Sequence, residues 1–170
     1  AKNVNEFPST RLPVSIITGF LGSGKTTLIN HLVKQRGMES TALIINEFGK
    51  IGLDNLLVES AIENALLLEN GCICCSIRGD LIDTICGLFI KVNNQQIPEF
   101  SRILIETTGL ADPGPILESM EKETSVIDRC RVDCVVAIVD GLLGRAQTEK
   151  FEEAAVQVAH ADIGLISKCD

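Results

Sequence analysis

The sequence feature that most restricts the fold is a glycine-rich segment near the amino terminus, GFLGSGKTT at residues 19–27. An apolar run, VSII at 14–17, precedes it, and a helical pattern of apolar residues at 28–33 follows it. Strand, glycine loop and helix in this order are the context in which the motif GxxxxGK[ST] forms a phosphate-binding P-loop. Gly22 and Gly24 carry no Cβ, so successive backbone N–H groups can wrap a phosphate chain. The helix directs its positive N-terminus at the same anion.

The motif also assigns individual roles within the loop. We expect Lys25 to neutralise the β- and γ-phosphates and the Thr26 hydroxyl to hold Mg²⁺. The alternative is a glycine-rich turn with an incidental lysine, and the complete motif with its flanks argues against it. The predicted phosphate-binding residues are Gly19, Phe20, Leu21, Gly22, Ser23, Gly24, Lys25, Thr26 and Thr27.

Composition excludes several classes of protein. The chain has 170 residues, 45% of them hydrophobic, which is the size of one domain with its own core. Its net charge is −8 and its basic residues are scattered, so we expect it to bind neither nucleic acid nor an anionic membrane. No apolar stretch approaches the ~20 residues of a membrane span, and residues 1–12 lack a signal-peptide core, which favours the cytoplasm or the nucleus. Seven clustered cysteines indicate reduced thiols for metal binding or chemistry more than disulfides.

Apolar runs alternate with helical patterns along the chain. This alternation predicts an α/β fold with a mainly parallel sheet flanked by helices, in a domain over residues 13–170 after a loose lead-in over 1–12. The strands expected after the P-loop are Thr41–Asn46, Ala65–Glu69, Arg102–Glu106, Cys134–Asp140 and Ile163–Ser167. The expected helices run from the P-loop to Gly37, over Asp80–Val92 with Asp80 as N-cap, and over Glu149–Val158.

Ligands of such sheets bind beyond the carboxyl ends of the strands. We therefore expect Glu47, Glu106, Asp140 and residues 167–170 to converge on one crevice. Glu106 begins the sequence ETTG, which is followed by ADPGP at 111–115 with two prolines, a composition that suits a mobile switch. A carboxylate there can hold a Mg²⁺ water while the N–H of Gly109 meets the γ-phosphate. An ordinary turn at a strand end is the alternative.

The last four residues, SKCD, follow the last expected strand. They match the guanine-reading motif of GTPases, in which Asp170 accepts from guanine N1 and N2, the stem of Lys168 lies across the ring and Ser167 stands at the first position. Adenine offers no such pairing, so the motif predicts GTP as the nucleotide. A solvated turn is the alternative reading of so short a match.

Three thiols lie within four residues in the sequence GCICC at 71–75. Zinc holds thiolates in a tetrahedron, which an extended strand would not allow because it points Cys74 and Cys75 to opposite faces. We therefore expect a turn, which Gly71 permits, and zinc bound by Cys72, Cys74 and Cys75. The alternatives are small buried residues or a redox pair. The motif has no fourth ligand, which Glu47, a partner subunit or a client could supply. The other cysteines are expected to be packing or surface residues: Cys86, Cys130, Cys134 and Cys169.

Taken in order, GFLGSGKTT, NEFG, GCICC, ETTGLADPGP and SKCD resemble the GTPase domain of the CobW-type metallochaperones, which include the zinc-regulated GTPase metalloprotein activators. The resemblance runs from about Pro13 to Asp170. It implies GTP hydrolysis coupled to metal transfer to a client metalloprotein, and a homodimer that forms on nucleotide binding. By position it implies that Glu47 and Glu106 are the Mg²⁺ and switch carboxylates, and that the three cysteines hold the transferred metal.

Two departures from the family pattern stand out. Ser167 occupies a position where many members have Asn, and the family usually carries a C-terminal domain beyond the base motif, so we expect this chain to be a fragment. A P-loop ATPase with a structural cysteine metal site, and a non-catalytic thiol module that buffers metal, are the alternative functions. The sequence leaves open the client, the physiological metal among zinc, cobalt, nickel and copper, and the oligomeric state.

Overall fold

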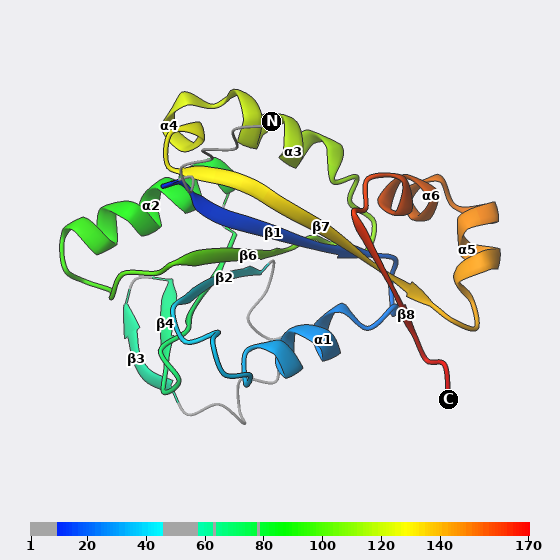
Figure 1. Ribbon diagram of the computed structural model, residues 1–170, viewed down its shortest axis with the longest axis horizontal. Helices are drawn as coiled ribbons and strands as arrows, with labels where there is room; N and C mark the ends of the chain where they lie inside the picture. The colour runs from blue at the N-terminus through cyan, green and yellow to red at the C-terminus, as the bar shows by residue number, and fades with distance from the viewer. Residues whose placement is uncertain (1–9, 46–57, 63, 78) are drawn as a thin grey trace, which may run out of the picture.

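The structure is a computed structural model that describes residues 10–45, 58–62, 64–77 and 79–170. In these residues a single eight-stranded sheet has the order β3-β4-β5-β2-β6-β1-β7-β8 (Figure 1). The strands are β1 Leu12–Gly19, β2 Thr41–Ile45, β3 Val58–Ile62, β4 Ala65–Leu68, β5 Ile73–Ser76, β6 Arg102–Glu106, β7 Cys130–Asp140 and β8 Ile163–Ser167.

Most of the sheet is parallel. Every neighbouring pair from β5 to β8 runs in the same direction, whereas β4 pairs antiparallel with both β3 and β5. The carboxyl ends of the six parallel strands therefore lie along one edge of the sheet, where an α/β protein binds its ligands. This confirms the predicted α/β class. The strands β3 and β5 were not predicted, and β4 and β5 form a hairpin that periodicity did not indicate.

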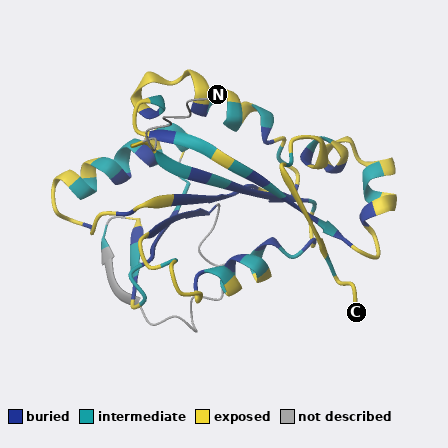
Figure 2. Cartoon of the chain, viewed as in Figure 1, coloured by how far each residue is buried: buried dark blue, intermediate teal, exposed yellow. Residues whose placement is uncertain are grey.

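Helices cover both faces of the sheet. They are α1 Lys25–Leu32, α2 Leu81–Asn93, α3 Gly114–Lys122, α4 Thr124–Ile127, α5 Gly144–Lys150 and α6 Glu152–Ala159. Ile29 of α1 packs on one face in a cluster with Ile17, and Ile85 of α2 and Met120 of α3 pack on the other in a cluster with Ile16. Successive residues of β1 thus enter opposite core layers, as strand geometry requires. Figure 2 shows the central strands buried and the edge strand β8 exposed.

Several predicted boundaries were wrong. Helix α1 ends at Leu32 and not at Gly37, because the chain continues in turns up to Gly37. The helix expected over Glu149–Val158 is two helices, since Phe151 between them is extended, with φ −118° and ψ 120°. The N-cap of α2 was correct, because the carboxylate of Asp80 accepts from the N–H of Ile82 and Asp83. Helices α3 and α4 were not predicted.

No helix in the part of the chain that the structure describes combines the length and the apolar character that crossing a bilayer requires.

Candidate functional site

The P-loop joins β1 to α1, as predicted. Gly22 and Gly24 have φ angles of +73° and +109°, in the left-handed region that favours glycine, and Gly24 is the N-cap of α1. Gly19 also has a positive φ, +153°, and a Cβ there would in addition lie 2.7 Å from the carbonyl oxygen of Ile138. The glycines of the motif thus serve both backbone conformation and close packing.

The P-loop and the end of β6 enclose a common cavity of about 370 Å³. Glu106, only 1% exposed, and Gly109 contribute to it from the β6 side. The predicted convergence of the P-loop with the Glu106 segment is therefore present in the folded chain. The lining residues are Leu21, Gly22, Gly24, Lys25, Thr26, Thr27, Glu106 and Gly109.

Lys25 is buried in the first turn of α1. Its Nζ donates to the carbonyl oxygens of Gly19 at 2.6 Å and Phe20 at 3.2 Å. The ammonium group thereby closes the loop on itself. Binding of a phosphate chain would replace these carbonyl acceptors by charged oxygens, which form stronger hydrogen bonds with an ammonium group.

The segment after β6 is fixed against the P-loop. Both the backbone N–H and the hydroxyl of Thr107 donate to the carbonyl oxygen of Ile17, at 3.0 and 3.2 Å. Two residues further on, Gly109 lies so close to the P-loop that an added Cβ would be 2.8 Å from the backbone nitrogen of Leu21. Only a glycine allows this approach between the two segments.

The predicted base motif at the end of β8 also contacts the P-loop. The hydroxyl of Ser167 donates to the carbonyl oxygen of Ser23 at 2.5 Å, and Nζ of Lys168 donates to that of Gly22 at 2.7 Å. These bonds link the P-loop to the end of β8. Asp170, the predicted guanine reader, is exposed.

Lys168 has a second partner, Asp140, which the sequence indicated only as a carboxylate at the end of a strand. Its Nζ donates to Oδ2 of Asp140 at 2.6 Å, and Oδ1 of Asp140 accepts from the N–H of Leu142 and Leu143. The hydrogen bond from Lys168, followed by these backbone donors, lowers the pKa of Asp140. Asp140 therefore orients Lys168, the lysine of the predicted base motif. Nothing in its own sequence neighbourhood distinguishes it from an ordinary strand end.

Glu47, expected as a Mg²⁺ carboxylate and as a possible fourth zinc ligand, lies outside the described residues.

The turn expected across the cysteine motif is in a different place. Leu68 N–H donates to the carbonyl oxygen of Cys72 and Gly71 N–H donates to that of Leu68, so the turn precedes the cysteines. Gly71 has φ +86°, as a turn residue can, and a Cβ there would meet the carbonyl oxygen of Glu39 at 2.9 Å. Residues 73–76 form β5, an extended strand. The expectation of a turn that gathers the thiols was therefore wrong.

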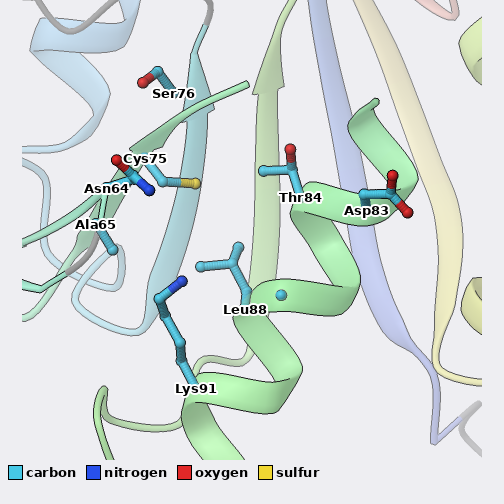
Figure 3. A pocket seen from close by; sticks show the side chains of 9 residues that line it. Asn64, Ala65, Cys75, Ser76, Asp83, Thr84, Leu88 and Lys91 are labelled. Atoms are coloured by element: carbon cyan, nitrogen blue, oxygen red, sulfur yellow. The ribbon is translucent and has the colours of Figure 1, made fainter. Parts of the chain in front are cut away.

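As a result the cysteines face opposite sides of the sheet. Cys72 and Cys74 are buried in the core layer under α1, and Cys75 is buried in the layer under α2. Figure 3 shows the Cys75 sulfur directed into a cavity of about 190 Å³, toward which Lys91 of α2 also extends. Within residues 10–45, 58–62, 64–77 and 79–170, no group of three His, Cys, Asp or Glu side chains is placed to hold a metal ion.

The thiols are protonated in this arrangement. Burial raises the pKa of Cys72, of Cys74 and, to about 12, of Cys75. The Cys72 thiol also donates to the carbonyl oxygen of Met38 at 2.9 Å. The three groups therefore behave as small packing residues here, and their role as zinc ligands stays a prediction.

Fold and cavity together define a P-loop nucleotide-binding domain on an α/β sheet. Residues 13–170 match the family model described as CobW/HypB/UreG, nucleotide-binding domain. The match covers most of the chain, so the chain belongs to this family.

The curated relatives of the chain include zinc chaperones. The zinc chaperone YjiA of Escherichia coli (strain K12) is 38% identical over 159 residues, which are 94% of this chain and 50% of that protein. The zinc-regulated GTPase metalloprotein activator 1 of Schizosaccharomyces pombe is 30% identical over 166 residues, 94% of this chain and 39% of that protein. The chain thus spans half or less of the length of these relatives.

Solved structures agree with the fold. The Zn(II)-bound YjiA GTPase from E. coli superposes with a TM-score of 0.80 at 35% identity, over 92% of this chain and 49% of that one. A Zn(II)-bound triple mutant of the same GTPase, with one glutamate and two cysteines replaced by alanine, gives a TM-score of 0.81. The signal recognition particle receptor FtsY from Elizabethkingia anophelis, at 16% identity and a TM-score of 0.51, shares the fold alone.

Proposed function

We propose that this domain is the GTPase part of a zinc metallochaperone. It binds GTP with Mg²⁺ in the cavity between the P-loop and the end of β6. Hydrolysis is coupled to the transfer of zinc from the cysteine motif to a client metalloprotein. The observation that carries the proposal is this cavity, where Lys25, Thr26, Glu106 and Gly109 come together from two distant parts of the chain. The names of the relatives, zinc chaperone and zinc-regulated GTPase metalloprotein activator, support zinc as the cargo.

The residues in the cavity suit a magnesium nucleotide. A hydroxyl and a carboxylate are oxygen ligands of the kind that Mg²⁺ prefers, and Thr26 and Glu106 supply one each. When bound, Mg²⁺ neutralises the charge that develops on the phosphate oxygens. Lys25 exchanges its carbonyl acceptors for the β- and γ-phosphates, and the backbone N–H of Gly109 contacts the γ-phosphate. Ser167, Lys168 and Asp170 select guanine.

Zinc is the cargo in this proposal, held by Cys72, Cys74 and Cys75. Because Cys75 faces the α2 side and the other two face the α1 side, binding by all three requires β5 to change its backbone. It also requires the buried thiols to lose their protons. Zinc loading is therefore expected to be coupled to a local rearrangement and not to fill a site that already exists.

Such a rearrangement can be linked to the nucleotide through the sheet. In the strand register Cys74 of β5 lies beside Leu43 of β2, and Leu43 lies beside Leu104 of β6. Leu104 is two residues before Glu106, which lines the cavity. We infer that ordering of the β6 end by the γ-phosphate favours the β5 conformation that binds zinc.

The complete proposal includes a homodimer that forms on GTP binding.

The test is zinc affinity measured by competition with a chromogenic chelator, with no nucleotide, with Mg-GDP and with a non-hydrolysable Mg-GTP analogue. The analogue is expected to tighten zinc binding by about 5- to 150-fold, the usual range of coupling between two sites. Zinc must then tighten binding of the analogue by the same factor. Equal zinc affinity in all three states contradicts the metallochaperone function and favours a structural metal site.

Two variants sharpen this test. Replacing the three cysteines of the motif by Ser should abolish the coupling but leave nucleotide binding intact in metal-free buffer. Cys169→Ser is the matched control, because Cys169 is exposed and follows β8, which lies far from β5 in the strand order. This variant should retain the coupling. Competition between GTP and ATP separates the proposal from the alternative of a P-loop ATPase, which would not prefer GTP.

A further inference from the structure

Helix α6 holds the segment after β6 through one buried side chain. Gln157 is 1% exposed, and its Nε2 donates to the carbonyl oxygens of Gly109 at 3.0 Å and Ala111 at 3.1 Å. Both partners are acceptors only, so the NH₂ group of the amide, which has two N–H donors, must face them. A buried amide that joins residues 46 and 48 positions away in the sequence fixes the conformation of the segment between them.

Two other residues, at the ends of α6, contact the segment after β6 and the P-loop. Nε2 of His160, directly after α6, lies 3.5 Å from Oδ1 of Asp112. The ring of Phe151, directly before α6, stacks on Phe20 of the P-loop with centroids 4.9 Å apart. The start of helix α6 therefore lies against the P-loop. Its last turn and the residue after it lie against residues 109–112.

We propose that Gln157 is a positioning residue for the triphosphate: it holds Gly109 against the P-loop, where the γ-phosphate binds. This inference rests on the proposed nucleotide function. Gly109 lies in direct contact with Leu21, and Gln157 binds the carbonyl group of the same glycine. A contact that is already formed does not have to be ordered when the ligand binds, so the ligand binds more tightly. A diphosphate does not reach Gly109 and gains nothing from this positioning.

The first test needs no nucleotide. Gln157→Leu keeps a side chain of similar size but removes both donors, and Gln157→Glu keeps the shape but leaves at most one donor, the O–H of the protonated acid, for two carbonyl groups. Both variants should increase hydrogen exchange at the backbone amides of residues 109–112, while the amides of β1 keep their protection. The control is Ile85→Val, a change in the core under α2 that lowers stability without contacting this segment.

The second test is the ratio of affinities for a non-hydrolysable GTP analogue and for GDP, both with Mg²⁺. Two lost hydrogen bonds correspond to a loss of about 5- to 150-fold for the analogue. The affinity for GDP should stay within about twofold, and Ile85→Val should leave the ratio unchanged. A purely structural role would weaken both nucleotides together.

The outcomes distinguish this inference from the proposed function. Unchanged exchange at residues 109–112 in both variants overturns the positioning role, and so does an equal loss of GDP and of the analogue. If the unaltered protein binds neither nucleotide, the proposed function and the γ-phosphate part of this inference both fail. Increased exchange without a change in the affinity ratio also overturns the inference, while leaving the GTPase function intact.

Discussion

The close approach of Gly109 to the P-loop allows a sharp test of the cavity. In Gly109→Ala the added Cβ would lie 2.6 Å from Cδ2, 2.8 Å from N and 2.9 Å from Cα of Leu21. Two of these three atoms belong to the backbone, so the neighbour cannot avoid the methyl group by a rotamer change. Ordinary contact distances require the two segments to separate by roughly 0.5 to 1 Å. The φ angle of Gly109 is outside the left-handed region, so alanine adds no backbone strain.

Overpacking of this kind costs about 1–3 kcal/mol. If the segment stays in place, the free energy of unfolding falls by that amount. If the segment moves away, the affinity for a triphosphate falls instead, by about 5- to 150-fold. Urea unfolding and fluorescence titration with a non-hydrolysable GTP analogue measure the two quantities, and we expect their combined loss to reach about 1–3 kcal/mol.

Gly87→Ala is the matched control for this experiment. Gly87 lies within α2, and a Cβ there would meet no heavy atom within 4 Å. The substitution should therefore raise the free energy of unfolding by about 0.5–1 kcal/mol, because alanine is the better helix former. A Gly109→Ala protein that unfolds and binds the analogue like the unaltered chain would refute the close contact between residue 109 and the P-loop.

Two further predictions concern the charge of the P-loop and the buried thiols. Lys25→Ala should abolish binding of Mg-GTP in a fluorescence titration, because no other described residue in the cavity lining is a cation; tight binding would remove Lys25 from the site. The free energy of unfolding should fall above pH 9 by up to ~1.4 kcal/mol per pH unit for each buried thiol, since the unfolded thiols then ionise while the folded ones, with raised pKa, stay protonated. Urea unfolding between pH 8 and 10 measures this loss; a flat profile, or the same slope in Cys74→Ala as in the exposed control Cys169→Ala, would contradict the burial of the thiols.

Much of the fold and of the nucleotide site could be predicted because the signals were local. The apolar runs of the central strands β1, β2 and β6 are largely buried on both faces and form continuous hydrophobic stretches in the sequence. The P-loop glycines have positive φ angles that the motif itself specifies. The strand-end rule then placed Glu106 beside the P-loop without any knowledge of the helices. The strands and the P-loop could be predicted because the residues of each short segment determine its conformation.

The parts that failed depend on contacts between distant segments. Gln157 looks like any polar residue of a short helix, and only the folded chain brings it to Gly109 and Ala111. The hairpin of β4 and β5 was missed for the same reason. Residues 73–76 are isoleucine, two cysteines and serine, and their extended conformation depends on pairing with β2 and β4.

That pairing changes how the cysteine motif has to be understood. Cys74 lies between Leu43 of β2 and Leu66 of β4 in the strand register, so moving it toward Cys75 requires breaking ladder bonds on at least one side. The ladder to β4 belongs to a short antiparallel hairpin, whereas the ladder to β2 continues into the parallel core, where β2 pairs with β6. Two of the four residues of β4 are only partly buried, whereas all five residues of β2 are buried. Opening the hairpin side therefore exposes less apolar area and is the less costly rupture. We expect zinc loading to detach β4 from β5, which frees β5 to bend between Cys74 and Cys75, while Ile73 at the start of β5 stays paired with Ala42 of β2. The motif then stays connected, through β2, to the strand that leads to Glu106. Hydrogen exchange on addition of zinc should then rise at the amides of residues 65–68 and stay low at those of residues 41–45; a rise in both would mean that the whole edge of the sheet opens and that this route of coupling is wrong.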